Sequence, residues 1–349
     1  MYIYILDKSL KRIGVIDNWV SLIWTTRYYG YGDFELYLPV TTEYLSLLKE
    51  DYYLETTESK CVMIIEGINI KTGAENGNYL TVSGRSVESL LERRVICNRI
   101  NLANTSVEKI ILNYLIPYNF TSPITDAAKR KMDLIAIGEP KGFDDEITTQ
   151  YFGDNVYEVV VELCQGYGYG FRMPLVNGKF TFELYAGKRR TRDQTLNVPA
   201  IFSPAFENLV NTEYTHNKQE YKNVAFVAGE GEGSLRKTAF SGSASGIDRR
   251  EIFVDARDLS SENVSSTTYY TAMLTNRGKD KLAETGVTCE YVGEVNNFPD
   301  YCELGDIVEV ENEFGMKATT RITEIIESYS TSGNTRVPTF DEWSVQKWL

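Results

Sequence analysis

Residues 33–38 read DFELYL, a run in which polar and apolar side chains alternate. Successive side chains of a β-strand point to opposite faces of a sheet, so this period of two predicts a strand with one buried face. The pattern returns near the end of the chain, from Ile307 to Val310 and again over 319–326. Strand signals at both ends predict a β-rich fold.

The N-terminal part is expected to consist mostly of strands. Residues 62–70 and 79–83 bracket the polar run 72–78, which predicts a hairpin with a long tip. A short helix is expected over 42–49, and another after Gly84, where three apolar residues share one face: Val87, Leu90 and Leu91.

The middle of the chain is mixed. Residues 105–108, TSVE, match an N-terminal capping box, and the helix that follows is expected to end at Pro117. A second helix is expected to begin after Asn155 and to end at Gly166. Asn177-Gly178 predicts a tight hairpin turn. This part therefore has the pattern of a small α+β domain.

These patterns predict a β-rich α+β, multi-domain protein, with two β-barrels or sandwiches that carry insertions. Residues 1–95 are expected to form the first β-barrel and 96–200 an inserted α+β domain. Residues 201–349 are expected to form the second β-barrel, with an insertion around 230–285 that contains a helix over 267–284. The polar stretch 122–149 gives no prediction.

Composition argues against nucleic-acid binding. The chain has 49 acidic and 36 basic side chains and a net charge of −13, whereas a nucleic-acid binder needs Lys and Arg to displace counterions from phosphates. A basic run at 188–192, KRRTR, is expected to be a solvated turn. No apolar stretch approaches the roughly 20 residues of a membrane span, so no membrane insertion is expected. The N-terminus has the pattern of an opening strand, not of a signal peptide.

No catalytic, metal or cofactor site is indicated. The five cysteines form no CxxC pair, and His216, the only histidine, lies in a polar, turn-like stretch without a nucleophile context. The acids 144–146 cluster in an apparently exposed loop, which is a weak signal for a glycosidase pair in so acidic a chain. The chain is therefore predicted not to be an enzyme.

Residues 224–238, VAFVAGEGEGSLRKT, combine a strand, a glycine loop and two cations, the parts of a phosphate site. A phosphate loop needs Gly-Lys-Ser/Thr at the start of a helix, whereas 235–240 alternates like a strand. Glu230 and Glu232 would each repel a phosphate charge by roughly 1–3 kcal/mol at about 5 Å. The stretch is therefore predicted to be a strand, an acidic turn and a returning strand, with Arg236 paired to nearby acids.

Several motifs together resemble the tail hub, or baseplate hub, proteins of long-tailed bacteriophages and related phage-derived injection particles. Both ends and the third quarter of the chain carry the resemblance, while 95–200 matches only loosely. The motifs are WTTRY at 24–28, GDFEL at 32–36, LP at 38–39, IIEGI at 64–68, GRS at 84–86, LLERR at 90–94, the stretch 224–238, RRE at 249–251, FVDARD at 253–258, LGDIV at 304–308, RITEI at 321–325 and PTF at 338–340.

The resemblance implies a homotrimer in which two similar β-barrels per subunit form a six-fold-like ring that docks on the tail tube. Expected partners are the tail tube or distal tail protein, the tape-measure protein and a spike or tip protein. The protein is then expected at the tail tip or baseplate of the virion, after assembly in the host cytoplasm. An acidic lumen would not retain passing DNA, and lytic or adhesive activity is expected to belong to another subunit.

Interface residues are expected within these motifs. They are Trp24, Arg27, Asp33, Arg85, Arg93, Glu230, Glu232, Arg236, Asp306 and Arg321. The arginines Arg85, Arg93 and Arg94 beside Glu88 and Glu92 either anchor a short helix, pair with an adjacent subunit or lie on a solvated helix face. The alternative function is a β-rich module that binds or cleaves glycans, which the 24 tyrosines would suit.

Overall fold

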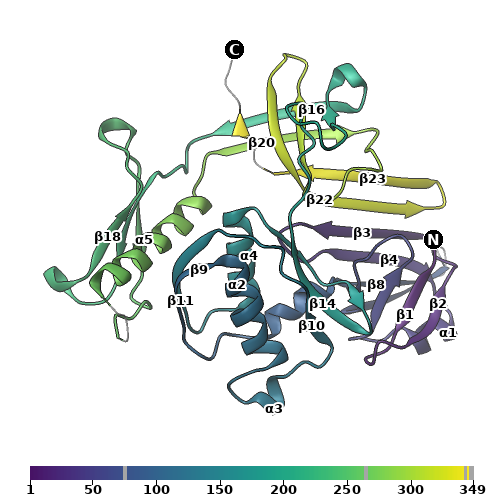
Figure 1. The fold of residues 1–349 in the computed structure, drawn as a ribbon. Coiled ribbons are helices and arrows are strands. Elements are labelled where there is room, and N and C mark those ends of the chain that lie inside the picture. The colour runs from purple at the N-terminus through teal and green to yellow at the C-terminus, as the bar shows by residue number, and fades with distance from the viewer. Residues whose placement is uncertain (74–76, 263–265, 342–343, 346–349) are drawn as a thin grey trace.

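The computed structural model describes residues 1–73, 77–262, 266–341 and 344–345 (Figure 1). It confirms the β-rich fold, with several separate sheets and few helices. Within these ranges no helix combines the length and apolarity needed to cross a membrane.

The largest sheet has nine strands and joins the two ends of the chain. β22 (Lys317–Ser330) pairs antiparallel with β3 (Ser21–Arg27), from Glu324 opposite Arg27 to Ser330 opposite Ser21. The other strands of this sheet are β4 (Asp33–Pro39), β7 (Gly67–Gly73), β8 (Gly77–Arg85), β15 (Ile201–Phe202), β21 (Ile307–Glu311), β23 (Gly333–Phe340) and β24 (Ser344–Val345).

The predicted elements of the N-terminal part are confirmed. The DFELYL run lies in β4, and its apolar positions Phe34, Leu36 and Leu38 are buried. β7 and β8 form the predicted hairpin, but their pairing extends into the predicted tip, with Thr72 opposite Asn78 and Gly73 opposite Gly77; residues 74–76 lie outside the described residues. The expected helices are α1 (Thr42–Leu47) and the 3-10 helix η1 (Val87–Arg93). A four-stranded sheet of β1 (Ile3–Leu6), β2 (Arg12–Ile16), β5 (Tyr53–Thr56) and β6 (Met63–Ile64) completes this part.

The middle part shares its core with the N-terminal part, because Val62 and Leu91 belong to the same buried cluster as Ile111, Phe171 and Phe180. The polar stretch without a prediction forms α3 (Ala127–Arg130) and β10 (Ile135–Ile137) and reaches into β11 (Glu146–Tyr151). The remaining strands here are β9 (Ile100–Ser106), β12 (Gly170–Arg172), β13 (Leu175–Val176) and β14 (Lys179–Tyr185). Asn177 and Gly178, with φ of 51° and 72°, form the predicted turn between β13 and β14.

The helix boundaries in the middle part differ from the prediction. The first helix is capped by Ser106, whose Oγ accepts from the Lys109 amide, not by Thr105. Pro117 does not end it: α2 (Val107–Lys109) continues through the π-helices η2 (Ile110–Leu115) and η3 (Pro117–Thr121). The preceding Ile116 is already helical, so Pro117 lies within the helical path although it has no amide donor.

The second helix, α4 (Val156–Tyr167), begins after Asn155 as predicted, and the Asn155 side chain accepts from the Tyr157 amide. It ends at Gly168 and not at Gly166, because Gly168 adopts the left-handed conformation that closes the helix, with φ of 72°.

A separate lobe stands at the left of Figure 1, where the parallel pair β17 (Val224–Ala228) and β19 (Glu251–Asp255) and the antiparallel β18 (Thr238–Ser241) form a small sheet. The predicted helix α5 (Thr267–Glu284) covers one face of this sheet. The chain enters the lobe along β16 (Leu209–Asn217) and leaves it along β20 (Thr288–Val295), and these two strands pair as an antiparallel ribbon.

Candidate functional site

The turn Gly305-Asp306 organises the site where the C-terminal and middle parts meet. The buried Asp306 carboxylate accepts from the backbone amides of Lys188 at 2.7 Å and Glu303 at 3.0 Å, and it forms an ion pair with Arg190. Arg190 is also buried, and it donates to the carbonyl oxygens of Val198 at 3.3 Å and Tyr301 at 2.6 Å. The prediction of a solvated turn at 188–192 is thus wrong at Arg190, because Asp306 provides a buried partner.

Tyr28 connects this turn to the other two parts of the chain. Its ring is fully buried, and its hydroxyl lies 3.1 Å from the Gly168 carbonyl oxygen and 3.2 Å from that of Tyr185. Arg321 donates to the Tyr28 hydroxyl at 3.3 Å and to the Gly305 carbonyl at 2.9 Å. Its guanidinium lies 5.0 Å from the centre of the Tyr28 ring. A tyrosine at the end of β3 therefore links all three predicted domains.

Arg27 bridges two strands of the nine-stranded sheet. Its Nη1 lies 2.6 Å from Asp33 on β4, and its Nε lies 2.6 Å from Glu324 on β22. Burial disfavours the charged form of Arg27, but the two carboxylates outweigh this effect and raise its pKa.

Arg85 also pairs with two carboxylates. It contacts Glu66 through two nitrogens at 2.8 and 2.9 Å and Glu92 at 2.6 Å, and the bonds to Glu66 are the largest factor that raises its pKa. Since Glu92 lies on η1, Arg85 anchors that short helix, the first of the two predicted alternatives. Arg93 pairs with Asp51 at 3.4 Å on the surface.

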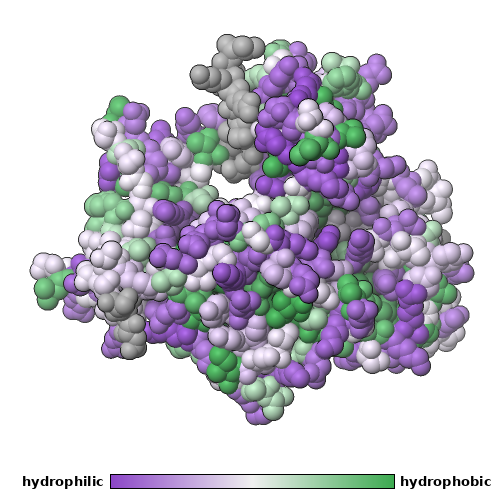
Figure 2. Space-filling model, in the orientation of Figure 1, coloured by the Kyte–Doolittle hydropathy of each residue, from purple (hydrophilic) through white to green (hydrophobic). Residues whose placement is uncertain are grey.

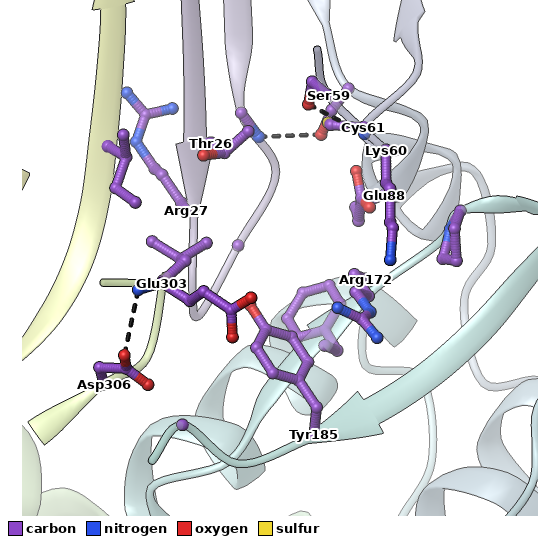
Figure 3. Close-up of a pocket in the computed structure, with 18 of the residues that line it drawn as sticks. Thr26, Arg27, Ser59, Lys60, Cys61, Glu88, Arg172, Tyr185, Glu303 and Asp306 are labelled. Carbon is purple, nitrogen blue, oxygen red and sulfur yellow. Dashed lines mark hydrogen bonds between the residues drawn. The ribbon is translucent and has the colours of Figure 1, made fainter. Parts of the chain in front are cut away.

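A cavity of about 300 Å³ lies beside these residues (Figure 3). Its walls come from all three parts of the chain and include Lys60, Glu88, Arg172 and Glu303. Glu88 is only 5% exposed; one carboxyl oxygen accepts from the Met173 amide at 2.7 Å, and the other has no hydrogen-bond partner. Burial raises the pKa of Glu88.

The cavity has neither a histidine nor a reactive thiol in its lining. Burial raises the pKa of Cys61 well above its usual value, which keeps it a poorly nucleophilic thiol. No histidine lines the cavity, and His216 lies on β16 as an exposed residue, not in the turn that the sequence indicated. Across the described ranges, no group of three or more His, Cys, Asp or Glu side chains could hold a metal ion.

The glycine loop confirms the prediction of strand, turn and strand. Gly231 has a φ of 98° between β17 and β18, and the turn holds only a three-residue 3-10 helix, η5 (Gly233–Leu235). Arg236 donates to Asp255 at 2.7 Å, which confirms that it pairs with a nearby acid. Glu230 accepts from the Ser261 amide at 2.8 Å, while Glu232 is exposed.

The structure brings five of the ten predicted interface residues to one region. We call the region where the three parts of the chain meet the junction; at or beside it lie Arg27, Asp33, Arg85, Asp306 and Arg321. Arg93 lies on the surface beside Asp51, and the glycine loop lies on the lobe. Trp24 packs in the N-terminal core, and both its ring and Asp306 are buried within the protomer. These two side chains therefore contribute to packing within the protomer.

Sequence reasoning missed three residues that hold the junction: Tyr28, Glu88 and Arg190. Glu88 and Met173 are 85 residues apart, and Arg190 and Asp306 are 116 apart. The sequence predicts Glu88 on a helix with neighbouring charges, and the same pattern is typical of a helix face in solvent, so it does not indicate that Glu88 is buried. The WTTRY and LGDIV motifs contain Tyr28 and Asp306, but nothing in them indicates that these two positions meet.

Known proteins match this chain both in sequence and in fold. Residues 2–340 match the family model described as Siphovirus ReqiPepy6 Gp37-like protein. The fold resembles that of prophage tail protein gp18 from Listeria monocytogenes EGD-e, with a TM-score of 0.57 and 12% identity over 99% of this chain and 95% of that one. It also resembles the 43 kDa tail protein of prophage MuSo2 from Shewanella oneidensis, with a TM-score of 0.58 and 11% identity over 98% of both chains.

A tail protein from Neisseria meningitidis MC58 is similar to the same degree, with a TM-score of 0.56 and 12% identity over 97% of this chain and 96% of that one. No curated protein matches the chain. At these identities the solved structures show the fold alone, and the family model confirms the resemblance to phage tail and baseplate proteins that the motifs indicated. The chain belongs to the Siphovirus ReqiPepy6 Gp37-like protein family.

Proposed function

We propose that this protein is a structural subunit of the phage tail tip or baseplate, in which three copies form a ring between the six-fold tail tube and a tip protein or spike. The observation that carries the proposal is the family match over 2–340, together with the tail-protein fold over nearly the whole chain. Both support a structural role in a tail and favour a non-enzymatic protein.

The two Gly-Asp motifs support a pair of similar docking units within one subunit. Gly32-Asp33 leads directly into β4, and Gly305-Asp306 leads directly into β21. Each aspartate pairs with an arginine, Asp33 with Arg27 and Asp306 with Arg190. We propose one β-barrel docking unit in 1–95 and the other in 201–349, with 96–200 as the inserted domain. Two such units in each of three subunits would match the six-fold tail tube.

Arginines that already pair with carboxylates within the protomer are less available for contacts with partners. Arg27 and Arg85 each hold two carboxylates within the protomer, so they connect neighbouring segments at one end of the interior strands β3, β4 and β8. A partner that binds at this end of the sheet would contact polar side chains that are already held in place. Exposed charges there would raise the rate of association more than the affinity. The proposed partners are the tail tube or distal tail protein, the tape-measure protein and the tip protein.

The experiment that tests this function is electron microscopy of the particle with this subunit labelled. We expect the label at the end of the tail tube, in a ring of three copies. A label on the head, or protein found only outside the particle, would overturn the proposal. A saccharide-binding assay on the purified protein serves as the control for the glycan-binding alternative, and we expect no binding.

A further inference from the structure

The lobe carries an apolar sheet face that the rest of the protomer does not cover. α5 packs on the inner face of the lobe sheet, against Ala225, Val227 and Val254. The outer face carries three phenylalanines in register, since Phe226 lies opposite both Phe240 and Phe253. We call Phe226, Phe240 and Phe253 the phenylalanine face.

The phenylalanine face is a fixed surface. Its ring centres lie 4.9 Å and 6.1 Å apart, and the guanidinium of Arg249 stands 5.2 Å from the Phe240 ring. Phe240 and Phe253 are 54% and 57% exposed. Since a phenylalanine side chain offers on the order of 200 Å² of surface, these two rings alone leave roughly 220 Å² of apolar area in water. Aromatic side chains, phenylalanine among them, are enriched in protein interfaces relative to the rest of the surface.

A second apolar surface lies near the other end of the chain's β16–β20 ribbon. Leu196 is 92% exposed and Val198 is 60% exposed, and Tyr301 lies beside them because its hydroxyl donates to the Pro199 carbonyl at 3.1 Å. Arg190 fixes this surface by holding the carbonyls of Val198 and Tyr301. We call Leu196, Val198 and Tyr301 the loop patch.

The ribbon sets the distance between the two surfaces. The loop patch is tied to the start of β16, because Asn208 donates to the Ile201 carbonyl at 2.8 Å, and the lobe follows the end of β16 at Asn217. A strand advances about 3.4 Å per residue, so the two surfaces are separated by a ribbon of about 25 Å. Figure 1 shows the lobe projecting from the rest of the chain at its end of this ribbon.

We infer that the phenylalanine face of one protomer docks on the loop patch of the next copy of this chain. Contacts around a ring are heterologous, so each subunit must present two different surfaces that are complementary to each other and set apart. The two exposed apolar surfaces at the ends of the ribbon meet this requirement. Two arginines beside the phenylalanine face already have partners within the lobe, Arg236 with Asp255 and Arg249 with Glu251. This inference rests on the proposed trimer.

The test uses two double variants of the full chain, F240S/F253S and L196S/V198S, in sedimentation experiments. We expect wild-type protein to form trimers and each variant to associate at least about thirtyfold more weakly, as expected when interface centres are truncated. Phe314→Ser is the matched control, since Phe314 is 83% exposed on the β21–β22 hairpin, outside both surfaces, and this variant should remain trimeric.

The decisive measurement is an equimolar mixture of the two double variants. Each variant keeps the surface that the other lacks, so the mixture should form dimers and stop there. Monomeric wild-type protein, a trimeric variant, or a mixture that remains monomeric would each overturn the inference. Its failure is separable from that of the proposed function, because a labelled subunit at the tail tip would stand even if these surfaces did not bind copies of the chain.

Discussion

Replacing Arg190 by methionine tests whether the buried ion pair holds the junction. Methionine keeps the apolar stem of the side chain but removes the guanidinium that pairs with Asp306. The carboxylate then keeps only the amides of Lys188 and Glu303 as donors, while it stays buried. Removing one member of a buried ion pair typically costs about 3–5 kcal/mol, and because two donors remain we expect about 3 kcal/mol.

The assay is hydrogen exchange of the peptide that covers 186–200. The Arg190 amide donates to the Ile307 carbonyl and the Ala200 amide donates to the Arg190 carbonyl, so both report local opening of this segment. A loss of about 3 kcal/mol corresponds to roughly hundredfold faster exchange, at about 1.4 kcal/mol per factor of ten. Asp306→Asn added to Arg190→Met removes the unpaired charge and should restore part of the protection.

Asp33→Asn is the matched control, because the ion pair of Asp33 with Arg27 is far more exposed than that of Asp306 with Arg190, with side chains 45% and 37% exposed. An exposed pair contributes about 0–1 kcal/mol, so exchange around β4 should change less than about tenfold. Exchange of 186–200 in Arg190→Met that stays close to the wild-type rate would refute the reasoning. So would an effect of Asp33→Asn as large as that of Arg190→Met.

Further outcomes are expected at other positions. Burial raises the pKa of Glu88, so the neutral form is favoured in the folded protein. The stability of the wild-type protein should therefore fall as pH rises through that raised pKa. Glu88→Gln should remove this part of the pH dependence in thermal melts. Gly305→Ala should lower the melting temperature, because Gly305 has a φ of 91° and a Cβ there would lie 2.2 Å from the Tyr28 ring; unchanged melting would contradict this packing. If the glycine loop faces the channel, Glu230→Lys with Glu232→Lys should slow DNA ejection from particles, and unchanged ejection would rule out an electrostatic role for the loop.

The sequence predicted the local elements of this fold better than the contacts between them. The alternation of residues 33–38 predicted β4, and the pattern after Asn155 predicted α4, because period and capping act over a few residues. The first helix was mispredicted at both ends, since Ser106 competes with Thr105 for the cap and the helical path continues past Pro117.

The candidate site could be predicted only as a set of motifs. The GD and WTTRY motifs contain residues of the junction, but the partners of Arg190 and Glu88 lie far away in sequence. A basic run such as 188–192 has the pattern of a solvated turn until a buried carboxylate from another part of the chain meets it. Which charges are buried depends on the tertiary arrangement, and the local pattern of residues around a charge does not indicate its distant partners.

The pairing of β22 with β3 also sets when the protein can fold during synthesis. β3 lies between β4 and β22, so one of its edges stays without hydrogen-bond partners until residues 317–330 have left the ribosome. Contacts between such distant segments slow folding, and an open strand edge can pair with other chains in the meantime. The protein therefore completes its largest sheet only after residues 317–330 have been translated.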